Sequence, residues 1–422
     1  MKPERGLAAR PARRAAARAS LWYCLIALLL SLALPGATAR AQALPPETDA
    51  AAPAISLLTV GPGEIYFERF GHNAIVVRDG NSDHAVAYNY GMFDFEQENF
   101  LLNFVRGHML YRIAASLLDD DLAMYRAEGR SVTEQALDLT PDEARALNDY
   151  LIWNARPENA WYRYDYFKAN CSTRVRDALD QALGGLIHAQ SVGRSRGYTY
   201  RLDALRLMAP DPTLMLLIDL GLGPYTDQRI DFWDESFVPM TLQHVVARVH
   251  RADGRPLVSS TRELAASRIA PPPALPPDLR LPFLFTGLAA ALAMAWLDSR
   301  GPRARRVFAA IAALFELLCA ITGCLLLFLW LGTDHRAAWR NENLLLFNPA
   351  CLLLSAVFLR RRPASRWQYG LAWLIVAAGA CMLASKILPD VAQSNLQWIL
   401  LVLPLHLVLA LRIGQRQVVS TA

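Results

Sequence analysis

Two side chains of the central region have the chemistry and the setting of a nucleophile and its base. Cys171 follows Asn170, a residue type that caps helices, and precedes apolar residues that share one helical face, so we predict that it lies in the first turn of a helix. A thiol at a helix N-terminus ionises readily, and the free peptide N–H groups there can bind an oxyanion. His72 begins the β-prone run HNAIVV, where a strand would hold the imidazole rigidly as a base. The pair predicts nucleophilic catalysis by cysteine.

The distribution of the six cysteines favours the same interpretation. Cys24 lies in an N-terminal apolar run and four others lie in C-terminal apolar runs, so Cys171 has no partner for an internal disulfide in the region between them. A lone thiol in an oxidising compartment is usually a liability, and catalysis is the commonest reason for it. The structural alternatives, a buried helix cysteine and a polar residue at a strand start, remain open for Cys171 and His72.

A third polar group is expected to orient the imidazole. The run from His84 to Tyr90 alternates and follows the turn Asp79-Gly80, so it predicts a strand that forms a hairpin with residues 72–77. Asn89 and His84 both lie on that strand, and both are candidates for the orienting group.

Other site chemistry is weaker in this sequence. The histidines of the soluble region show no H-x-x-x-H or H-E-x-x-H spacing, and Cys171 has no C-x-x-C partner, so we expect neither a metal nor a cofactor. Residues 193–197 match the letters of G-x-S-x-G, but arginines and polar residues flank Ser195. A nucleophile elbow needs a buried strand before the serine and a helix after it, so the pattern disfavours a serine hydrolase.

The remaining elements of the soluble region follow from periodicity and capping. We predict strands over 55–60 and 132–139, and a mainly helical stretch over 96–127. Thr140-Pro141-Asp142-Glu143 is a capping-box start for a helix that runs to about Ala155. Residues 197–250 carry further helical pattern, including 241–249.

The N-terminus has the features of an export signal. Arg10, Arg13, Arg14 and Arg18 precede an apolar run from Leu21 to Leu34, and small residues that resemble a cleavage site follow it. An uncleaved anchor of the same orientation is the alternative, and both place the following region outside the cytoplasm. The hydrophobic content of 54% and the mean hydropathy of +0.18 are high for a soluble protein.

Five candidate membrane spans occupy the C-terminal third, over 281–297, 307–332, 344–359, 368–388 and 396–411. Arginines cluster in the first loop, in the third loop and after the last span, which the positive-inside rule assigns to the cytoplasm. An odd number of spans then also places the central region outside. Glu316 falls within the second span, where an acid is costly and often functional.

Charge separates these regions. Residues 1–20 and 298–422 are net positive and the stretch between them is net negative, although the whole chain carries +5. An acidic central domain argues against nucleic-acid binding, which requires a basic face. The predicted organisation is a signal peptide (1–43), a linker (44–54), an extracytoplasmic catalytic domain (55–265), a Pro-rich linker (266–280), a five-helix transmembrane domain (281–412) and a cytoplasmic tail (413–422).

Three motifs resemble the extracytoplasmic domain of the Lnb family of bacterial lipoprotein acyltransferases: Gly71-His72-Asn73-Ala74-Ile75, the run from Tyr88 to Phe95, and the run from Tyr166 to Arg174. The resemblance covers about residues 55–250 and extends to the five spans and to the loop that contains Asp334 and His335. It implies an α+β fold, a circularly permuted papain-like domain like that of lecithin:retinol acyltransferase, followed by the transmembrane helices, in the bacterial inner membrane with the catalytic domain in the periplasm.

The resemblance also implies roles and partners. Cys171 would be the nucleophile, His72 the base and Asn89 the orienting residue, with His84 kept open because its spacing from His72 is like that of a second histidine in the retinol-acyltransferase relatives. The acyl donor would be a phospholipid and the acceptor the N-terminal amine of a lipoprotein, passed through a Cys171 thioester. Substrate contacts are expected from the residues Tyr166, Asn170, Arg174 and His335.

Two other functions compete with this one. A cysteine peptidase or amidase that acts on peptidoglycan would use the same dyad, and five spans beside the domain favour a lipid substrate over it. A non-catalytic membrane assembly protein with a degenerate domain is the second alternative, and the intact Cys, His and Asn count against it.

Overall fold

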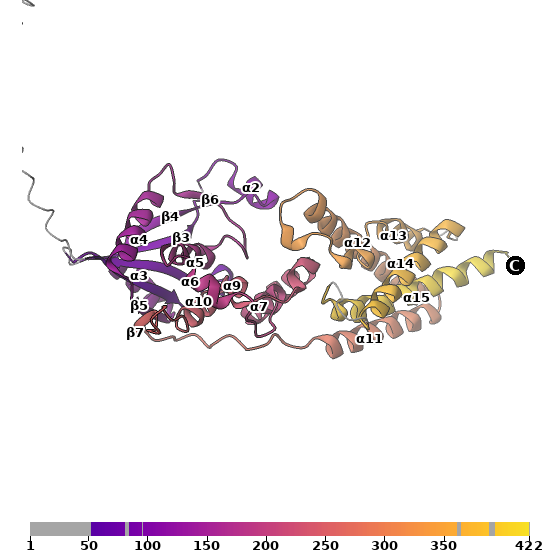
Figure 1. Ribbon diagram of the computed structural model, residues 1–422. Coiled ribbons are helices and arrows are strands. Elements are labelled where there is room, and N and C mark those ends of the chain that lie inside the picture. The colour runs from indigo at the N-terminus through magenta and orange to yellow at the C-terminus, as the bar shows by residue number, and fades with distance from the viewer. Residues whose placement is uncertain (1–51, 81–83, 95, 361–363, 388–392, 422) are drawn as a thin grey trace, which may run out of the picture. The chain divides into compact units, whose positions relative to one another are not determined.

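The computed structural model describes residues 52–80, 84–94, 96–360, 364–387 and 393–421. A mixed domain with one β-sheet precedes a set of long apolar helices, which confirms the predicted α+β domain and the transmembrane domain after it (Figure 1). The predicted signal peptide and most of the linker over 44–54 lie outside the described residues.

The described part of the soluble domain contains an antiparallel sheet of seven strands in the order β6-β4-β3-β2-β1-β5-β7. The predicted hairpin is its centre, because β2 and β3 pair antiparallel with Ala74 opposite Asn89. The strands are β1 (Ala54–Val60), β2 (His72–Arg78), β3 (Ala85–Met92), β4 (Leu110–Leu117), β5 (Val132–Leu137), β6 (Trp161–Arg163) and β7 (Val258–Ala265).

Alternating side chains of the central strands fill two cores, one on each face of the sheet. On one face Ile75 and Tyr88 pack with residues of α4, α5 and α10. On the other, Val76 and Ala87 pack with residues of α3. These helices are α3 (Leu118–Glu128), α4 (Pro141–Asn154), α5 (Cys171–Ala182) and α10 (Pro239–Val246); α4 starts with the predicted capping box at Thr140.

The expectation of a mainly helical stretch over 96–127 is wrong in its middle. Residues 110–117 form β4, which pairs with both β3 and β6, between α2 (Phe100–Arg106) and α3. Alanine and leucine in that run favour a helix locally, and pairing on two sides overrides the preference. The other helices of the domain are α6 (Leu186–Ser191), α7 (Tyr200–Met208), α8 (Pro212–Gly221) and α9 (Phe232–Glu235), with the 3-10 turns η1 (Tyr66–Glu68) and η2 (Pro224–Asp227).

Among the described residues, four helices are long and apolar enough to cross a membrane. They correspond to the first, second, fourth and fifth expected spans. The last helix continues through the stretch expected to be a tail. The four are α11 (Arg280–Ser299), α12 (Pro302–Leu331), α14 (Arg366–Ser385) and α15 (Leu396–Thr421).

The third expected span, 344–359, is a helix only over α13 (Cys351–Leu359), which follows η3 (Arg336–Ala338) and η4 (Glu342–Leu345). Nine helical residues extend only about 14 Å, half of the ~30 Å of hydrocarbon. The chain nevertheless returns along α12, because Phe347 contacts Gly323 and Phe358 meets Phe308 edge-to-face, with 5.9 Å between the ring centroids. The third crossing is therefore an irregular segment followed by a short helix.

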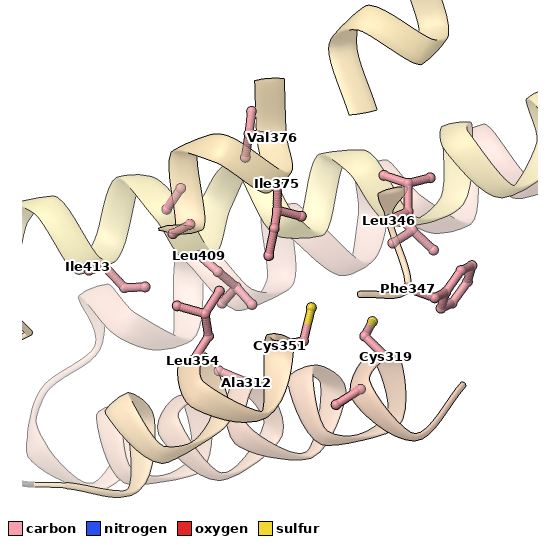
Figure 2. Packing of buried hydrophobic residues seen from close by; sticks show 14 of the residues in the cluster. Ala312, Cys319, Leu346, Phe347, Cys351, Leu354, Ile375, Val376, Leu409 and Ile413 are labelled. Atoms are coloured by element: carbon pink, nitrogen blue, oxygen red, sulfur yellow. The ribbon is translucent and has the colours of Figure 1, made fainter. Parts of the chain in front are cut away.

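Irregular backbone inside a membrane must be enclosed by protein. Leu346 and Phe347 lie in the same buried cluster as Cys319, Cys351 and residues of α14 and α15 (Figure 2). The carbonyl of Leu346 accepts a hydrogen bond from His406 Nε2 at 3.1 Å.

Glu316 helps to hold that histidine, because its carboxylate lies 3.4 Å from His406 Nδ1. The acid in the second span therefore contacts the histidine that supports the irregular crossing.

Loops of the membrane domain contact α8. Asn341 Nδ2 donates to the carbonyls of Leu220, Gly221 and Leu222 at 2.8–3.2 Å, where the helix has no N–H donors of its own for them. Gln393 Nε2 donates to Leu222 as well, at 3.1 Å. The loops after α12 and after α14 therefore lie on the same side as the soluble domain, as the charge pattern predicts.

Candidate active site

Cys171 is the first residue of α5, as predicted, and its side chain is half-buried. Asn170 is the N-cap. Its side-chain oxygen accepts a hydrogen bond from Thr173 N, and Thr173 Oγ1 accepts one from Asn170 N. The backbone N–H groups of Asn73 and Ser172 also act on the thiol and lower the pKa of Cys171. Helix start and backbone donors together make this position favourable for negative charge.

His72 begins β2, paired with Val60 of β1, so two strands fix its backbone. Its imidazole is hydrogen-bonded to the Cys171 side chain and, through Nε2, to Asn89 Oδ1 at 2.8 Å. The predicted nucleophile, base and orienting residue therefore form one continuous hydrogen-bonded array.

The surroundings of Asn89 determine which way its amide points. Its Nδ2 donates to an oxygen of Asp121 and to Ser116 Oγ, each at 2.9 Å, and a carboxylate oxygen only accepts. The Asn89 oxygen must then face His72, so Nε2 of the imidazole carries the proton that Asn89 accepts. Nδ1 is left to hydrogen-bond with Cys171, and it is the nitrogen that can take the thiol proton.

The electrostatics of the pair follow from this contact. Burial alone would raise the pKa of Cys171, but the charge of His72 and hydrogen bonds from His72, Asn73 and Ser172 lower it below its usual value. Burial alone would lower the pKa of His72, but the Cys171 thiolate and the hydrogen bonds to Cys171 and Asn89 raise it. Both directions favour a thiolate–imidazolium pair over a neutral thiol and imidazole.

Asp121 is a site residue that the sequence did not reveal. It lies in the first turn of α3, on the face of the sheet that carries His72 and Asn89, and it also accepts from Ser116 Oγ at 2.7 Å. The available signal was the acidic run 119–121 at a helix start, which has an ordinary explanation in the helix dipole. Nothing in the sequence of that run distinguishes Asp121 from the other two aspartates.

The alternative orienting residue, His84, lies elsewhere. It precedes Ala85, which pairs with Arg78, whereas Asn89 pairs with Ala74 near the other end of the hairpin. His84 is exposed and is separated from His72 by the length of β2. The geometry therefore assigns the orienting position to Asn89.

Two of the residues expected to contact substrate have structural partners. Asn170 is buried, and its amide donates to the carbonyls of Tyr166 and Phe237 at 3.1 and 2.9 Å. Arg174 stacks its guanidinium over the ring of Tyr162, 4.4 Å from the centroid. The carboxylate of Asp177 on the same helix pairs with Arg176.

The other two, Tyr166 and His335, lie together. Their rings stack at 5.9 Å, and both line a cavity of about 650 Å³. Tyr164 lines the same cavity and packs against the buried cluster that Cys171 also contacts. The basic residues of the lining, which suit an anionic group, are Arg163, Lys168, Arg336 and Arg340.

The G-x-S-x-G letters do not mark a second nucleophile. Ser195 Oγ donates to the carbonyl of Ile230 at 2.5 Å and accepts from Gly197 N at 2.9 Å. The serine therefore closes a turn between α6 and α7. Among the described residues, no group of three or more His, Cys, Asp or Glu side chains is placed to hold a metal ion.

Comparison with known families matches both parts of the chain. Residues 42–210 match the model of the Lnb N-terminal periplasmic domain, and residues 278–418 match the model of the Lnb transmembrane domain. Neither a curated protein nor a solved structure matches the chain.

Proposed function

The chain belongs to the Lnb family, with a periplasmic N-terminal domain and a multi-helix membrane domain, and from this premise we propose that it is a thiol acyltransferase of the bacterial inner membrane. In this proposal it moves an acyl chain from a phospholipid to the N-terminal amine of a lipoprotein. The observation that carries the proposal is the hydrogen-bonded array Cys171–His72–Asn89 at the start of a helix.

The first step forms a thioester. The Cys171 thiolate attacks the ester carbonyl of the phospholipid, and the C–O bond breaks as the tetrahedral intermediate collapses. The imidazolium of His72 gives its proton to the leaving alkoxide, so the products are an acyl-thioester on Cys171 and a lysophospholipid. N–H groups of the first turn of α5 would receive the oxyanion.

The second step releases the chain as an amide. The lipoprotein amine attacks the thioester carbonyl, His72 accepts the proton that the amine loses, and the C–S bond breaks to return the thiolate. Asn89 keeps the imidazole oriented in both steps. An amine is a good nucleophile toward a thioester, so the intermediate suits an aminolysis.

Both substrates are lipids, and the setting of the site fits them. The contacts of α8 with the loops after α12 and α14 hold the catalytic domain at the membrane domain. The cavity at Tyr166 and His335 can take a headgroup phosphate at Arg336 and Arg340, because Arg163 and Lys168 of its lining pair with Asp334 and Asp234. An enzyme anchored in this way meets both substrates at high effective concentration.

The proposal is tested by the acyl-enzyme. Full-length protein in lipid nanodiscs with a labelled phospholipid should acquire a hydroxylamine-labile label on the peptide that contains Cys171. The Cys171→Ala variant should lose the label, and the Cys381→Ala variant, which removes an exposed thiol of the membrane domain, should keep it.

Addition of a diacylglyceryl-cysteine peptide should then discharge the label to an N-acylated peptide, identified by mass spectrometry. If no label forms from any lipid while cell-wall peptides are cleaved, the acyltransferase proposal is wrong and the peptidase alternative holds. If neither reaction occurs, the assembly-protein alternative holds.

A further inference from the structure

An exposed apolar surface lies beside the site and has no function in the account above. It consists of the segment Ile65–Phe67 and of helix α2, and it is called here the α2 surface. Leu101 is 72% exposed and Tyr66 58% exposed. The other large apolar residues on it that are more than a third exposed are Ile65, Phe67, Leu102, Phe104 and Val105.

Helix α2 needs a covering partner to be stable. It has only seven residues, and none of them is buried. An isolated helix of this length is not stable in water, and helical stability comes mostly from packing an apolar face. Exposed apolar patches of this kind mark a partner or membrane contact.

The α2 surface is continuous with the site through aromatic rings. Phe67 contacts Phe93 at 6.3 Å, Phe93 contacts Tyr111 at 5.4 Å, and Tyr111 stacks on Tyr164 at 4.2 Å between centroids. Tyr111, Tyr164 and Cys171 all pack against the same buried cluster, so the series of rings ends in the core that also borders the nucleophile.

Two contacts join α2 to the end of a membrane span. Asp334 N donates to the carbonyl of Arg106 at 2.8 Å, and His335 Nε2 donates to the carbonyl of Phe104 at 3.0 Å. A Cβ on Gly107 would lie only 3.0 Å from the backbone of Asp334 and His335, so the end of α2 touches the loop that contains these two residues.

The loop follows α12 directly, and α12 ends in apolar side chains that are themselves exposed. Leu331 is 72% exposed, and Phe328 and Trp330 are more than a third exposed. The α2 surface therefore continues the lipid-facing surface of a span. Arg163 and His108 both pair with Asp334 at this level, and charged side chains are expected where a membrane surface meets water.

We propose that α2 and the segment 65–67 lie within the outer part of the bilayer, covered by lipid hydrocarbon, and that a phospholipid acyl chain moves from there along the rings of Phe93, Tyr111 and Tyr164 to Cys171. The inference deepens the proposed function, because it specifies how the acyl donor enters that site. A bilayer lipid is then the donor, rather than a lipid monomer taken from water.

Direct lipid contact is tested first, without reference to activity. Leu101 is replaced by the photo-crosslinking residue p-benzoylphenylalanine in the full-length chain, which is placed in nanodiscs of phosphatidylethanolamine and phosphatidylglycerol and irradiated. Phospholipid adducts on the α2 peptide are expected. The same replacement at Ile152, 46% exposed on α4 of the same domain, should give none. Adducts to a second copy of the chain, or equal lipid adducts at both positions, would overturn the proposal.

The route is tested next with the double variant Leu101→Glu, Val105→Glu. Acylation of Cys171 is measured with bilayer phospholipid and with a water-soluble short-chain ester, and the ratio of the two rates is compared with that of the unmodified chain. The ratio should fall by at least about tenfold, which corresponds to about 1.4 kcal/mol. Ile152→Glu should leave both rates and their ratio unchanged. A double variant with an unchanged ratio would overturn the route.

The two experiments separate this inference from the proposed function. If the unmodified chain forms no acyl adduct with either donor, the acyltransferase proposal fails, while lipid adducts at position 101 still establish the membrane contact. If the unmodified chain acylates but position 101 gives no lipid adduct, the function stands and the α2 inference is wrong.

Discussion

Asn89 donates an amide N–H to a carboxylate oxygen of Asp121 at 2.9 Å, while its own oxygen accepts from His72 at 2.8 Å. The carboxylate therefore acts on the imidazole through Asn89 and not by direct contact. It prevents the amide from turning its NH2 group toward His72, which would offer a donor where the imidazole needs an acceptor. Asp121 is therefore a positioning residue.

Replacement of Asp121 by Ala should slow acylation of Cys171 by about tenfold, the equivalent of one charge-assisted hydrogen bond of roughly 1.5 kcal/mol. Ser116→Ala should cost less, because Asp121 would still hold the amide. Asp119→Ala, which removes an exposed carboxylate from the same turn of α3, is the matched control.

A merely structural role for Asp121 would predict a different result. The melting temperature would fall, and the pH dependence of Cys171 alkylation would stay as in the unmodified chain. The positioning role predicts that the alkylation midpoint moves to higher pH, because His72 would no longer be held against the thiolate.

The close approach of Cys171 to the sheet depends on Gly91. A Cβ there would lie 3.3 Å from Cys171 Cβ, and the residue has a φ of +89°. Gly197 has a similar φ, +83°, with nothing within 4 Å of such a Cβ. Gly91→Ala and Gly197→Ala should both lose about 1–2 kcal/mol of stability to left-handed backbone strain. Only Gly91→Ala should also slow alkylation of Cys171, and equal alkylation rates would show that the contact is unimportant.

The local parts of the site were predictable because each depends on neighbours in sequence. The capping residue Asn170 places Cys171 at a helix start, and the alternation of residues 84–90 with the Asp79-Gly80 turn predicts the β2–β3 hairpin that carries His72 and Asn89. The choice between Asn89 and His84 depends on strand register, which a single sequence leaves open.

The parts that were missed depend on distant partners. Residues 110–117 become β4 only because strands pair on both sides, and Asp121 matters only because α3 packs beside Asn89. The irregular start of the third crossing likewise depends on His406, sixty residues farther along the chain. Composition alone predicts an apolar helix there.

The third crossing gives a stability prediction for the membrane domain. His406→Leu leaves both the carbonyl of Leu346 and the carboxylate of Glu316 without their partner, in surroundings that contain no water to replace it. Each orphaned group costs about 1–3 kcal/mol. The melting temperature in detergent should therefore fall clearly.

The double variant Glu316→Leu, His406→Leu is the informative comparison, because it removes the orphaned acid. It should be more stable than His406→Leu alone, and together with Glu316→Leu it completes the cycle that measures the coupling between the two residues. A single variant as stable as the unmodified chain would mean that the histidine does not support the irregular segment.

The last prediction concerns the charge state of the nucleophile. The pKa of Cys171 is lowered by His72, so the rate of its alkylation by iodoacetamide should remain high well below pH ~8.5, the range of a free cysteine. His72→Ala removes the imidazolium charge and its hydrogen bond and leaves the burial, which acts in the opposite direction. The midpoint of the alkylation profile should then rise by about one pH unit or more, where one unit corresponds to 1.36 kcal/mol.

The raised pKa of His72 adds a falling part to the pH profile of acylation, but not to that of alkylation. Below the pKa of Cys171 the thiol is protonated, and above the pKa of His72 the imidazole has no proton to give to the leaving alkoxide. Acylation by an ester should therefore be bell-shaped in pH, whereas alkylation, which needs only the thiolate, should reach a plateau. Alkylation is followed on the Cys171 peptide by mass spectrometry, because Cys324 and Cys381 are also exposed. His84→Ala should change neither the rising nor the falling part of the pH profile. If His72→Ala leaves the alkylation midpoint unchanged, His72 does not lower the pKa of Cys171.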